Sequence, residues 1–310
     1  MATLVVDGSY VLHRVMHVPQ LRQLCNKDKK PSGGVFGVTK SLRATIAQWS
    51  EINRAVFVFD GGRSKRRMEL YPEYKKRDPH DEVDPDGMSY IDKFRSQVRL
   101  LKFILPRMGV KVVQAMGYEA DDLIGHLCKT LDDQLILVSS DDRDMYQLVS
   151  PTVHIWRPMA EERVMLENFQ DVAGAKNREY WLLRKAILGD GSDNIPGVHG
   201  IGEKTADEVV SSCEDIGAPP HDKFFEYVAA VGSKRAQKIV AGKDIVLRNL
   251  ELVDISREVI PSVVTEEIKA TIATPNEFDI LTVKRMFVSL EFYSLIDDFG
   301  KWITQFQLLR

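Results

Sequence analysis

The chain has 310 residues, of which 44% are hydrophobic and 28% charged, and its 42 basic and 45 acidic residues leave a formal net charge of −3. These values are typical of a globular protein and exclude intrinsic disorder, collagen and coiled coil, and the charge balance argues against recognition of nucleic acid by bulk basicity. No apolar run approaches the roughly 18 residues of a membrane helix, and three widely spaced cysteines without a CxxC pair predict neither disulfides nor a zinc site, so we expect a cytoplasmic protein that is neither secreted nor membrane-bound.

Five short, β-branched apolar runs predict strands in the first 160 residues. The runs are continuously apolar rather than alternating, which is typical of parallel strands covered by helices on both faces. Helical patterns occur near 37–50, 89–107 and 120–131. We therefore predict an α/β fold with a doubly wound, mostly parallel sheet. The predicted strands are Leu4–Val6, Ala55–Phe59, Val110–Val113, Leu135–Val138 and Val153–Trp156.

From about residue 176 the pattern becomes helical, with one glycine-rich stretch, GDGSDNIPGVHGIGEKTADEVV. We predict three units: a core at 1–175, a helical domain at 176–255 and a C-terminal helical segment at 256–310. The aromatic-rich end of the last unit, FYSLIDDFGKWITQF, is expected to pack back on the sheet. A basic insertion interrupts the core at about 61–108. Long polar insertions between a strand and a helix are usually functional or mobile.

Acidic residues follow the ends of the predicted strands. In open α/β sheets the ligand crevice lies outside the carboxyl ends of the strands, so these side chains should converge. A second set stands at the start of the helical pattern near 120–131, and a third set stands in the GDGSDN turn. The three sets are Asp7, Asp60, Asp141, Asp142 and Asp144; Glu119, Asp121 and Asp122; and Asp190 and Asp193.

Taken singly, each of these carboxylates could be a turn residue or could complement a helix N-terminus. If these carboxylates lie in one crevice, they repel one another and raise one another's pKa values unless cations bind between them. Carboxylate oxygens are ligands that suit Mg²⁺ or Mn²⁺. Two such metals can promote in-line hydrolysis of a phosphate ester without a side-chain nucleophile. The sequence shows no GxSxG, HExxH or P-loop motif, and His13 and His17 lack a third partner for zinc.

The insertion after Asp60 is strongly basic. A charge run of this kind is often only a solvated surface. Here it follows a strand end that supplies a candidate metal ligand, and Tyr71 and Tyr74 offer rings on which nucleic-acid bases could stack. Cationic side chains beside a two-metal site would neutralise charge that develops on a phosphate. The basic residues are Arg63, Lys65, Arg66, Arg67, Lys75, Lys76 and Arg77.

The segment 197–205, GVHGIGEKT, joins two predicted helices. A helix, a glycine turn and a second helix expose backbone amides that can bind a DNA phosphate without reading the sequence, and Lys204 would add a positive charge. Glycine-rich turns are common, so this motif alone is weak evidence. It gains weight because it follows Asp190 and Asp193.

Several motifs, in the same order, resemble those of the 5′ nucleases, a family that includes flap endonucleases, the 5′ nuclease domain of bacterial DNA polymerase I and the bacteriophage 5′-3′ exonucleases also described as RNase H. The motifs are VVDGS, VFVFDGG, YPEYKKR, GYEADDLI, SSDDRDMYQL, GDGSDNIPGVHGIGEKTA and LRNLELVDI, and they cover about residues 3–255. LEFYSLIDDFG resembles the block that closes the nuclease domain of polymerase I. The resemblance implies a helical arch over the active site and a helix-hairpin-helix domain, and the absence of a polymerase domain looks most like a bacteriophage enzyme.

The resemblance also implies roles for individual residues. Lys75 would be a catalytic lysine carried by the arch, with Tyr74 as a stacking partner. The family usually has a basic residue three positions after this lysine; Asp78 stands there instead, so Arg77 or Lys76 could take that role. The resemblance implies a first metal site at Asp7, Asp60, Glu119, Asp121 and Asp142, with Asp122 close by. It implies a second metal site at Asp144, Asp190 and Asp193, beside which Asp141 is an extra acid. It also implies that the hairpin binds K⁺ through backbone carbonyls at Gly197, Gly200 and Gly202.

We therefore expect a structure-specific 5′ nuclease, with 5′-3′ exonuclease and 5′ flap endonuclease activities, that uses two Mg²⁺ or Mn²⁺ ions in DNA replication. Its substrates would be DNA with 5′ flaps, nicks or single-stranded 5′ ends, and RNA–DNA hybrids from which it would remove primers. It would work with replication proteins. We expect a monomer in a bacterial host cytoplasm. Two alternatives are a junction-binding protein on the same fold that has lost hydrolysis, and a compact PIN-type ribonuclease that needs neither arch nor hairpin. Asp144, Asp190 and Asp193 favour catalysis, because a binding-only relative would be expected to lack some of these carboxylates.

Overall fold

The computed structural model describes residues 1–76, 83–84, 86–215 and 222–309. Its centre is a six-stranded sheet in the order β3-β2-β1-β4-β5-β6, in which β1 to β5 run parallel and β6 pairs antiparallel with β5. The predicted mostly parallel α/β sheet is confirmed; β6 carries no apolar run and is not predicted. The strands are β1 (Ala2–Asp7), β2 (Arg54–Val58), β3 (Lys111–Val113), β4 (Leu135–Ser139), β5 (Val153–Arg157) and β6 (Glu162–Val164).

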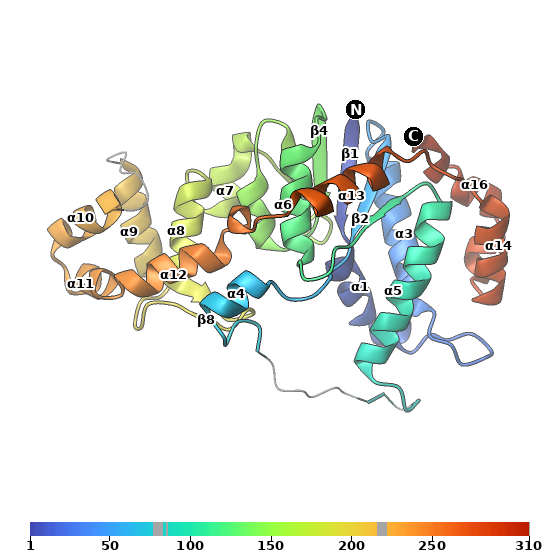
Figure 1. The fold of residues 1–310 in the computed structure, drawn as a ribbon, viewed down its shortest axis with the longest axis horizontal. Helices are drawn as coiled ribbons and strands as arrows, with labels where there is room; N and C mark the ends of the chain where they lie inside the picture. The colour runs from blue at the N-terminus through green and yellow to red at the C-terminus, as the bar shows by residue number, and fades with distance from the viewer. Residues whose placement is uncertain (77–82, 85, 216–221, 310) are drawn as a thin grey trace.

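Helices cover both faces of the sheet (Figure 1). Because side chains alternate along a strand, Leu4 and Val6 of β1 enter one hydrophobic core, with α1, α3 and α5, while Val5 enters a second core with α6. The helical patterns expected near 37–50 and 120–131 are α3 and α6. The helices of this half are α1 (Gly8–Met16), α2 (Pro19–Arg22), α3 (Gly33–Gln48), α4 (Lys65–Leu70), α5 (Tyr90–Arg107) and α6 (Ala120–Thr130).

A helical unit follows the sheet and extends away from it, with α9, α10 and α11 farthest from β1 (Figure 1). A two-stranded hairpin, β7 (Gly189–Asp190) and β8 (Ile195–Pro196), lies between α8 and α9, and α12 packs along α8. The helices are η1 (Arg143–Leu148), η2 (Leu166–Asn168), α7 (Phe169–Ala173), α8 (Arg178–Leu188), α9 (Glu203–Asp215), α10 (Asp222–Val231), α11 (Lys234–Ala241) and α12 (Lys243–Val253).

The C-terminal segment returns to the sheet. After η3 (Ile255–Arg257), α13 (Ser262–Ala273) packs beside β3, and α14 packs on α5. Aromatic side chains such as Phe287 and Trp302 join Leu4 and Val6 in the same core. The last helices are α14 (Ile280–Ser289), α15 (Tyr293–Ile296), α16 (Phe299–Ile303) and η4 (Phe306–Leu308).

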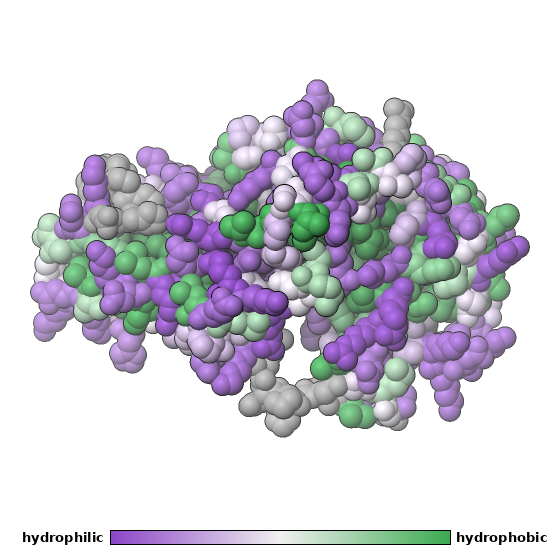
Figure 2. Space-filling view, viewed as in Figure 1, coloured by the Kyte–Doolittle hydropathy of each residue, from purple (hydrophilic) through white to green (hydrophobic). Residues whose placement is uncertain are grey.

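The face shown in Figure 2 is largely hydrophilic, with a small hydrophobic area near the start of α13, where Val259 and Val263 are exposed. Over the residues that the structure describes, no helix combines the length and the apolar character that crossing a membrane requires.

Candidate active site

The predicted carboxylates come together where the parallel strands end. Asp7 ends β1, and its Oδ1 accepts the backbone N–H of Tyr10 at 2.9 Å, so it caps α1. Asp60 follows β2, and its Oδ1 accepts the N–H of Ala120 at 2.7 Å, which ties the end of β2 to the start of α6. Asp142 follows β4 and caps η1. Segments that are distant in sequence thus place carboxylates at one edge of the sheet, as the topology requires.

A first cavity of about 520 Å³ opens at this edge. Its wall also contains Arg63 from the basic insertion, Lys75, and Asp193 from the turn after β7. All five carboxylates that the resemblance assigns to a first metal line this cavity: Asp7, Asp60, Glu119, Asp121 and Asp142.

A second cavity, of about 590 Å³, shares Asp142 with the first. Lys185 of α8 lines it together with the acids that follow β4 and α8. Within the described ranges, one group of three carboxylates has oxygen atoms that all lie within 4.8 Å of one another: Asp144, Asp190 and Asp193. These are the residues that the resemblance assigns to a second metal.

Two carboxylates of the first cavity have strongly raised pKa values. Burial raises the pKa of Asp7 to about 7, and the charges of Asp60 and Asp142 act in the same direction. Burial, together with the charge of Asp142, also raises the pKa of Asp121 well above its ordinary value. Such groups ionise readily only when positive charge is added beside them. The donor set is buried, acidic and rich in oxygen, and it therefore fits divalent cations.

Lys75 contacts a carboxylate of each cluster. Its Nζ lies 3.1 Å from Oε1 of Glu119 and 3.8 Å from Oδ1 of Asp193. Its backbone has a φ of 49°, and its N–H donates to the carbonyl of Asp193 at 2.9 Å. Burial alone would lower the pKa of Lys75, but nearby carboxylates, with Asp121 and Asp193 foremost, outweigh it and raise the pKa. Lys75 is therefore a fixed positive charge at the edge of the first cavity.

Lys185 is a functional candidate that sequence reasoning missed. Its Nζ contacts the carboxylate of Asp144 and lies 2.8 Å from Oδ2 of Asp190. Burial would raise the pKa of Asp190, but the ammonium of Lys185 and the hydroxyl of Ser192 outweigh it and lower the pKa to about 2. The only signal in the sequence is a lysine five residues before Asp190, which resembles any solvated helix position.

Three residues predicted to bind DNA or metal are placed differently. Arg67 is buried, and its guanidinium donates to both oxygens of Asp122, at 2.7 and 2.9 Å, and to Glu119 at 2.9 Å. Arg67 and Asp122 therefore pair with each other and line neither cavity, and the DNA contact predicted for Arg67 and the metal contact predicted for Asp122 stay predictions. Tyr74 is also buried, and its hydroxyl donates to Glu119 at 2.7 Å; its predicted stacking on DNA bases stays a prediction. Together, Arg67 and Tyr74 orient Glu119 toward the cavity.

Of the other basic residues that follow Asp60, Arg63 lines the first cavity. Arg66 is held by the chain that follows α12, through Oε2 of Glu258 at 3.2 Å. Arg77 lies outside the described residues. Arg63, Lys65 and Lys76 are exposed.

The glycine-rich hairpin joins α8 to α9. A Cβ on Gly197 would lie 2.1 Å from the carbonyl oxygen of Leu188, so this glycine allows the hairpin to pack on α8. Gly200 has a φ of 72°, a conformation that residues with side chains rarely adopt. Gly202 and Lys204 are exposed at the start of α9, where a phosphate could approach the backbone amides.

The two histidines considered for zinc belong to an aromatic stack. The ring of His13 lies 4.1 Å from that of Phe94, and its Nδ1 is 2.7 Å from the hydroxyl of Tyr90. His17 stacks on the other ring of this group, with 6.0 Å between the centroids of His17 and Tyr90. These contacts join α1 to α5 beside the first cavity.

Two family models match the chain. One is described as 5′-3′ exonuclease, N-terminal resolvase-like domain, and matches residues 2–174; the other is described as 5′-3′ exonuclease, C-terminal SAM fold, and matches residues 178–276. The chain belongs to the 5′-3′ exonuclease family. The exonuclease is accordingly a phosphodiesterase with metal-ion catalysis, and its carboxylate clusters supply the corresponding donor groups.

The exonuclease is similar to a 5′-3′ exonuclease of Buchnera aphidicola subsp. Acyrthosiphon pisum (strain APS), with 32% identity over 215 residues that cover 69% of this chain and 71% of that protein. It is also similar to the thermostable DNA polymerase I of Thermus thermophilus, with 29% identity over 301 residues, which are 96% of this chain but only 33% of the polymerase.

Two solved structures of the T5 D15 protein share the fold of the exonuclease. The protein co-crystallised with metal ions matches with a TM-score of 0.66 and 22% identity, over 87% of this chain and 98% of that one. The bacteriophage T5 D15 flap endonuclease in a complex with DNA and metal ions matches with a TM-score of 0.60 and 21% identity, over 99% of both chains.

Proposed function

We propose that this exonuclease is a structure-specific 5′ nuclease that cuts 5′ flaps, degrades 5′ ends at nicks in DNA and removes RNA primers during replication. The observation that carries the proposal is that two carboxylate-lined cavities meet at Asp142, while Lys75 contacts a carboxylate of each cluster. A phosphodiesterase that uses two metals needs paired clusters of this kind. The T5 D15 flap endonuclease, whose fold is shared, is bound to DNA and metal ions in its solved complex, which supports the same substrate class here.

The two clusters would hold two Mg²⁺ or Mn²⁺ ions. Bound divalent cations activate a water molecule and neutralise charge on the scissile phosphate. Because Asp142 lines both cavities, it is suited to fix the position of one cluster relative to the other. The proposed ligands are Asp7, Asp60, Glu119, Asp121 and Asp142 for the first ion and Asp144, Asp190 and Asp193 for the second.

Lys75 would act on the substrate itself. Its side chain is one-quarter exposed, so the ammonium can reach a phosphate in the first cavity, while Glu119 and Asp193 keep it charged and in place. A preorganised group aimed at charge that develops in the transition state typically contributes about 3 kcal/mol to catalysis. Removal of Lys75 should therefore affect turnover more than binding.

DNA would follow the positive and hydrogen-bonding groups that surround the two cavities. We assign contacts with the 5′ strand to Arg63, which lines the first cavity, and to Lys65 and Lys76, which are exposed in the same basic run. The hairpin would bind the duplex backbone through the amides near Gly202 and the charge of Lys204, and its carbonyls would hold K⁺. We further propose that the protein is a monomer, that its domain boundaries lie near residues 176 and 256, and that it works together with replication proteins.

The test is cleavage of end-labelled flap, nicked and RNA-primed substrates with Mg²⁺ and with EDTA. We expect cuts near the flap base, short products from nicked 5′ ends and primer removal, all abolished by EDTA and by Asp142→Asn. Binding of flap DNA without cutting in Mg²⁺ would identify a junction-binding protein instead. Cutting of single-stranded RNA without regard to a 5′ end would identify a PIN-type ribonuclease.

A further inference from the structure

Asp141 stands directly before Asp142, but its carboxylate joins neither of the two clusters. Its Oδ1 accepts the backbone N–H of Met159 at 3.0 Å, and its Oδ2 lies 3.3 Å from Nη1 of Arg14. The side chain is only 9% exposed. Both oxygens are therefore engaged with protein groups, and Asp141 is placed to hold protein elements rather than a metal ion.

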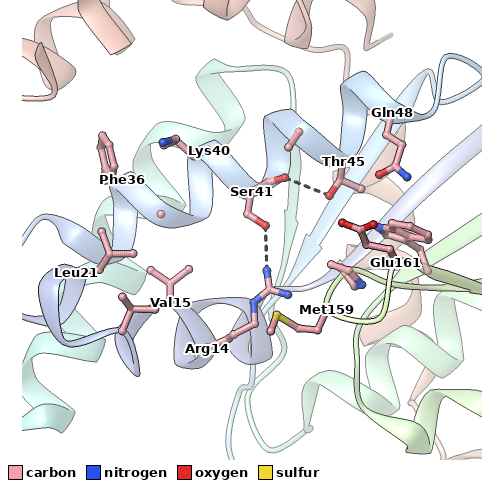
Figure 3. A pocket seen from close by; sticks show the side chains of 15 residues that line it. Arg14, Val15, Leu21, Phe36, Lys40, Ser41, Thr45, Gln48, Met159 and Glu161 are labelled. Carbon is pink, nitrogen blue, oxygen red and sulfur yellow. Dashed lines mark hydrogen bonds between the residues drawn. The ribbon is translucent and has the colours of Figure 1, made fainter. Parts of the chain in front are cut away.

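Arg14 extends this contact to two helices. It belongs to α1, and its Nη2 donates to the hydroxyl of Ser41 in α3 at 3.0 Å. Figure 3 shows Arg14 with Ser41 on one side and Met159 on the other, in the wall of a cavity of about 790 Å³ that lies between α1, α3 and the turn after β5. Asp141, in the loop after β4, thus joins α1 to the turn between β5 and β6, and Arg14 extends this contact to α3.

The same contacts reach the first metal cluster at two points. The hydroxyl of Ser140 donates to Oδ2 of Asp7 at 3.3 Å and accepts the N–H of Asp142 at 3.2 Å. Asp7 caps the helix that carries Arg14, and Asp142 is the next residue after Asp141. The pair of Arg14 and Asp141 therefore connects the two chain segments that present Asp7 and Asp142 to each other.

We propose that Asp141 is a positioning residue that, through Arg14, sets the spacing of Asp7 and Asp142 and thereby the affinity of the first carboxylate cluster for a divalent cation. The inference rests on the proposed function, because it takes this cluster to be a metal site. Partners that orient metal ligands typically contribute about 10- to 100-fold to metal affinity or activity. A contribution of this size gives the first acid of the DDRD run a role that its position in the sequence does not reveal.

The test measures Mn²⁺ binding to the full chain by calorimetry, without DNA. Asp141→Ala and Arg14→Ala should each weaken binding at the tighter site by roughly tenfold, and the double variant should lose no more than either single one, because both act through one contact. Turnover of flap DNA should fall in parallel at low Mg²⁺ and recover at high Mg²⁺, while KM for DNA stays unchanged. Asp141→Asn keeps an acceptor for the N–H of Met159, and it replaces the alanine variant if that one does not fold.

Asp133 provides a matched control at the opposite edge of the sheet. It is also a buried aspartate, with 4% of its side chain exposed, and it binds Arg54 and the hydroxyl of Thr3. Asp133→Asn should lower thermal stability and leave Mn²⁺ affinity unchanged. If the Asp141 variants likewise lose stability but bind Mn²⁺ as tightly as the wild type, Asp141 is only structural and the inference is overturned. If the wild type binds no Mn²⁺, the proposed function fails instead.

Discussion

Replacement of Asp7 with Asn should stabilise the exonuclease at neutral pH in EDTA. Burial raises the pKa of Asp7 from 3.8 to about 7, so between these values the folded protein holds a proton that the unfolded chain has released. The free energy of unfolding must then fall as pH rises through this window. About 3 pKa units at 1.36 kcal/mol each amount to a loss of about 4 kcal/mol by the upper end. Asn removes the ionisation but keeps an oxygen to cap α1.

The assay is urea unfolding at pH 5 and pH 7.5. In EDTA, the wild type should be less stable at the higher pH. Asp7→Asn should show a difference smaller by up to about 2.7 kcal/mol, because only about two of the three units lie between pH 5 and the folded pKa of about 7. Mg²⁺ should remove most of the wild-type loss, because a cation that binds the ionised carboxylates stabilises the folded state. Asp254→Asn is the matched control: Asp254 is also a buried capping aspartate, but it faces Arg178 at 2.6 Å rather than other acids. Equal pH dependence of wild type and Asp7→Asn in EDTA would refute the reasoning.

Three further predictions concern single side chains. Lys75→Ala should slow single-turnover cleavage by about 100-fold and leave the Kd for flap DNA unchanged; a parallel fall in binding, with normal cleavage of bound DNA, would contradict its catalytic role. Lys185→Ala should tighten Mn²⁺ binding in calorimetry, because it frees the Asp190 carboxylate from an internal cation; weaker binding would mean that Lys185 supports the ligands. Gly197→Ala should cost about 1–3 kcal/mol in urea unfolding, because its Cβ would meet the backbone of α8, whereas Gly202→Ala, with no atom within 4 Å, should be neutral.

The sheet and the position of the acids follow from the sequence because they depend on local and topological rules. Continuous apolar runs indicate parallel strands, and parallel strands end at one edge, so Asp7, Asp60 and Asp142 had to approach one another. The strand β6 could not be predicted in this way, because its three residues, ERV, form no apolar run. They form a strand by pairing with β5. Its formation depends on tertiary context.

Which charged residues are buried in ion pairs and which line a cavity could not be predicted from the sequence. Arg67 sits in the same basic run as Lys75, yet one is buried against Asp122 and the other reaches the cavity, because α4 turns one side chain toward the core. Likewise, Asp141 and Asp142 both line the second cavity, but only Asp142 also lines the first. The charge of a residue gives the sign of its interactions but does not identify its partner, because partners such as Asp122 for Arg67 lie far along the chain.

The segment that carries Lys75 is bonded to the turn that carries Asp193. The N–H of Lys75 donates to the carbonyl of Asp193 at 2.9 Å, and Nδ2 of Asn194 donates to the carbonyl of Glu73 at 2.8 Å. During translation, a chain that has left the ribosome only as far as residue 175 still has Glu119 to pair with Lys75, but it lacks the Asp193 anchor and the carboxylates of Asp190 and Asp193. Cleavage should begin only after the helical unit has emerged and folded, so unfinished copies cannot damage the nucleic acids around them.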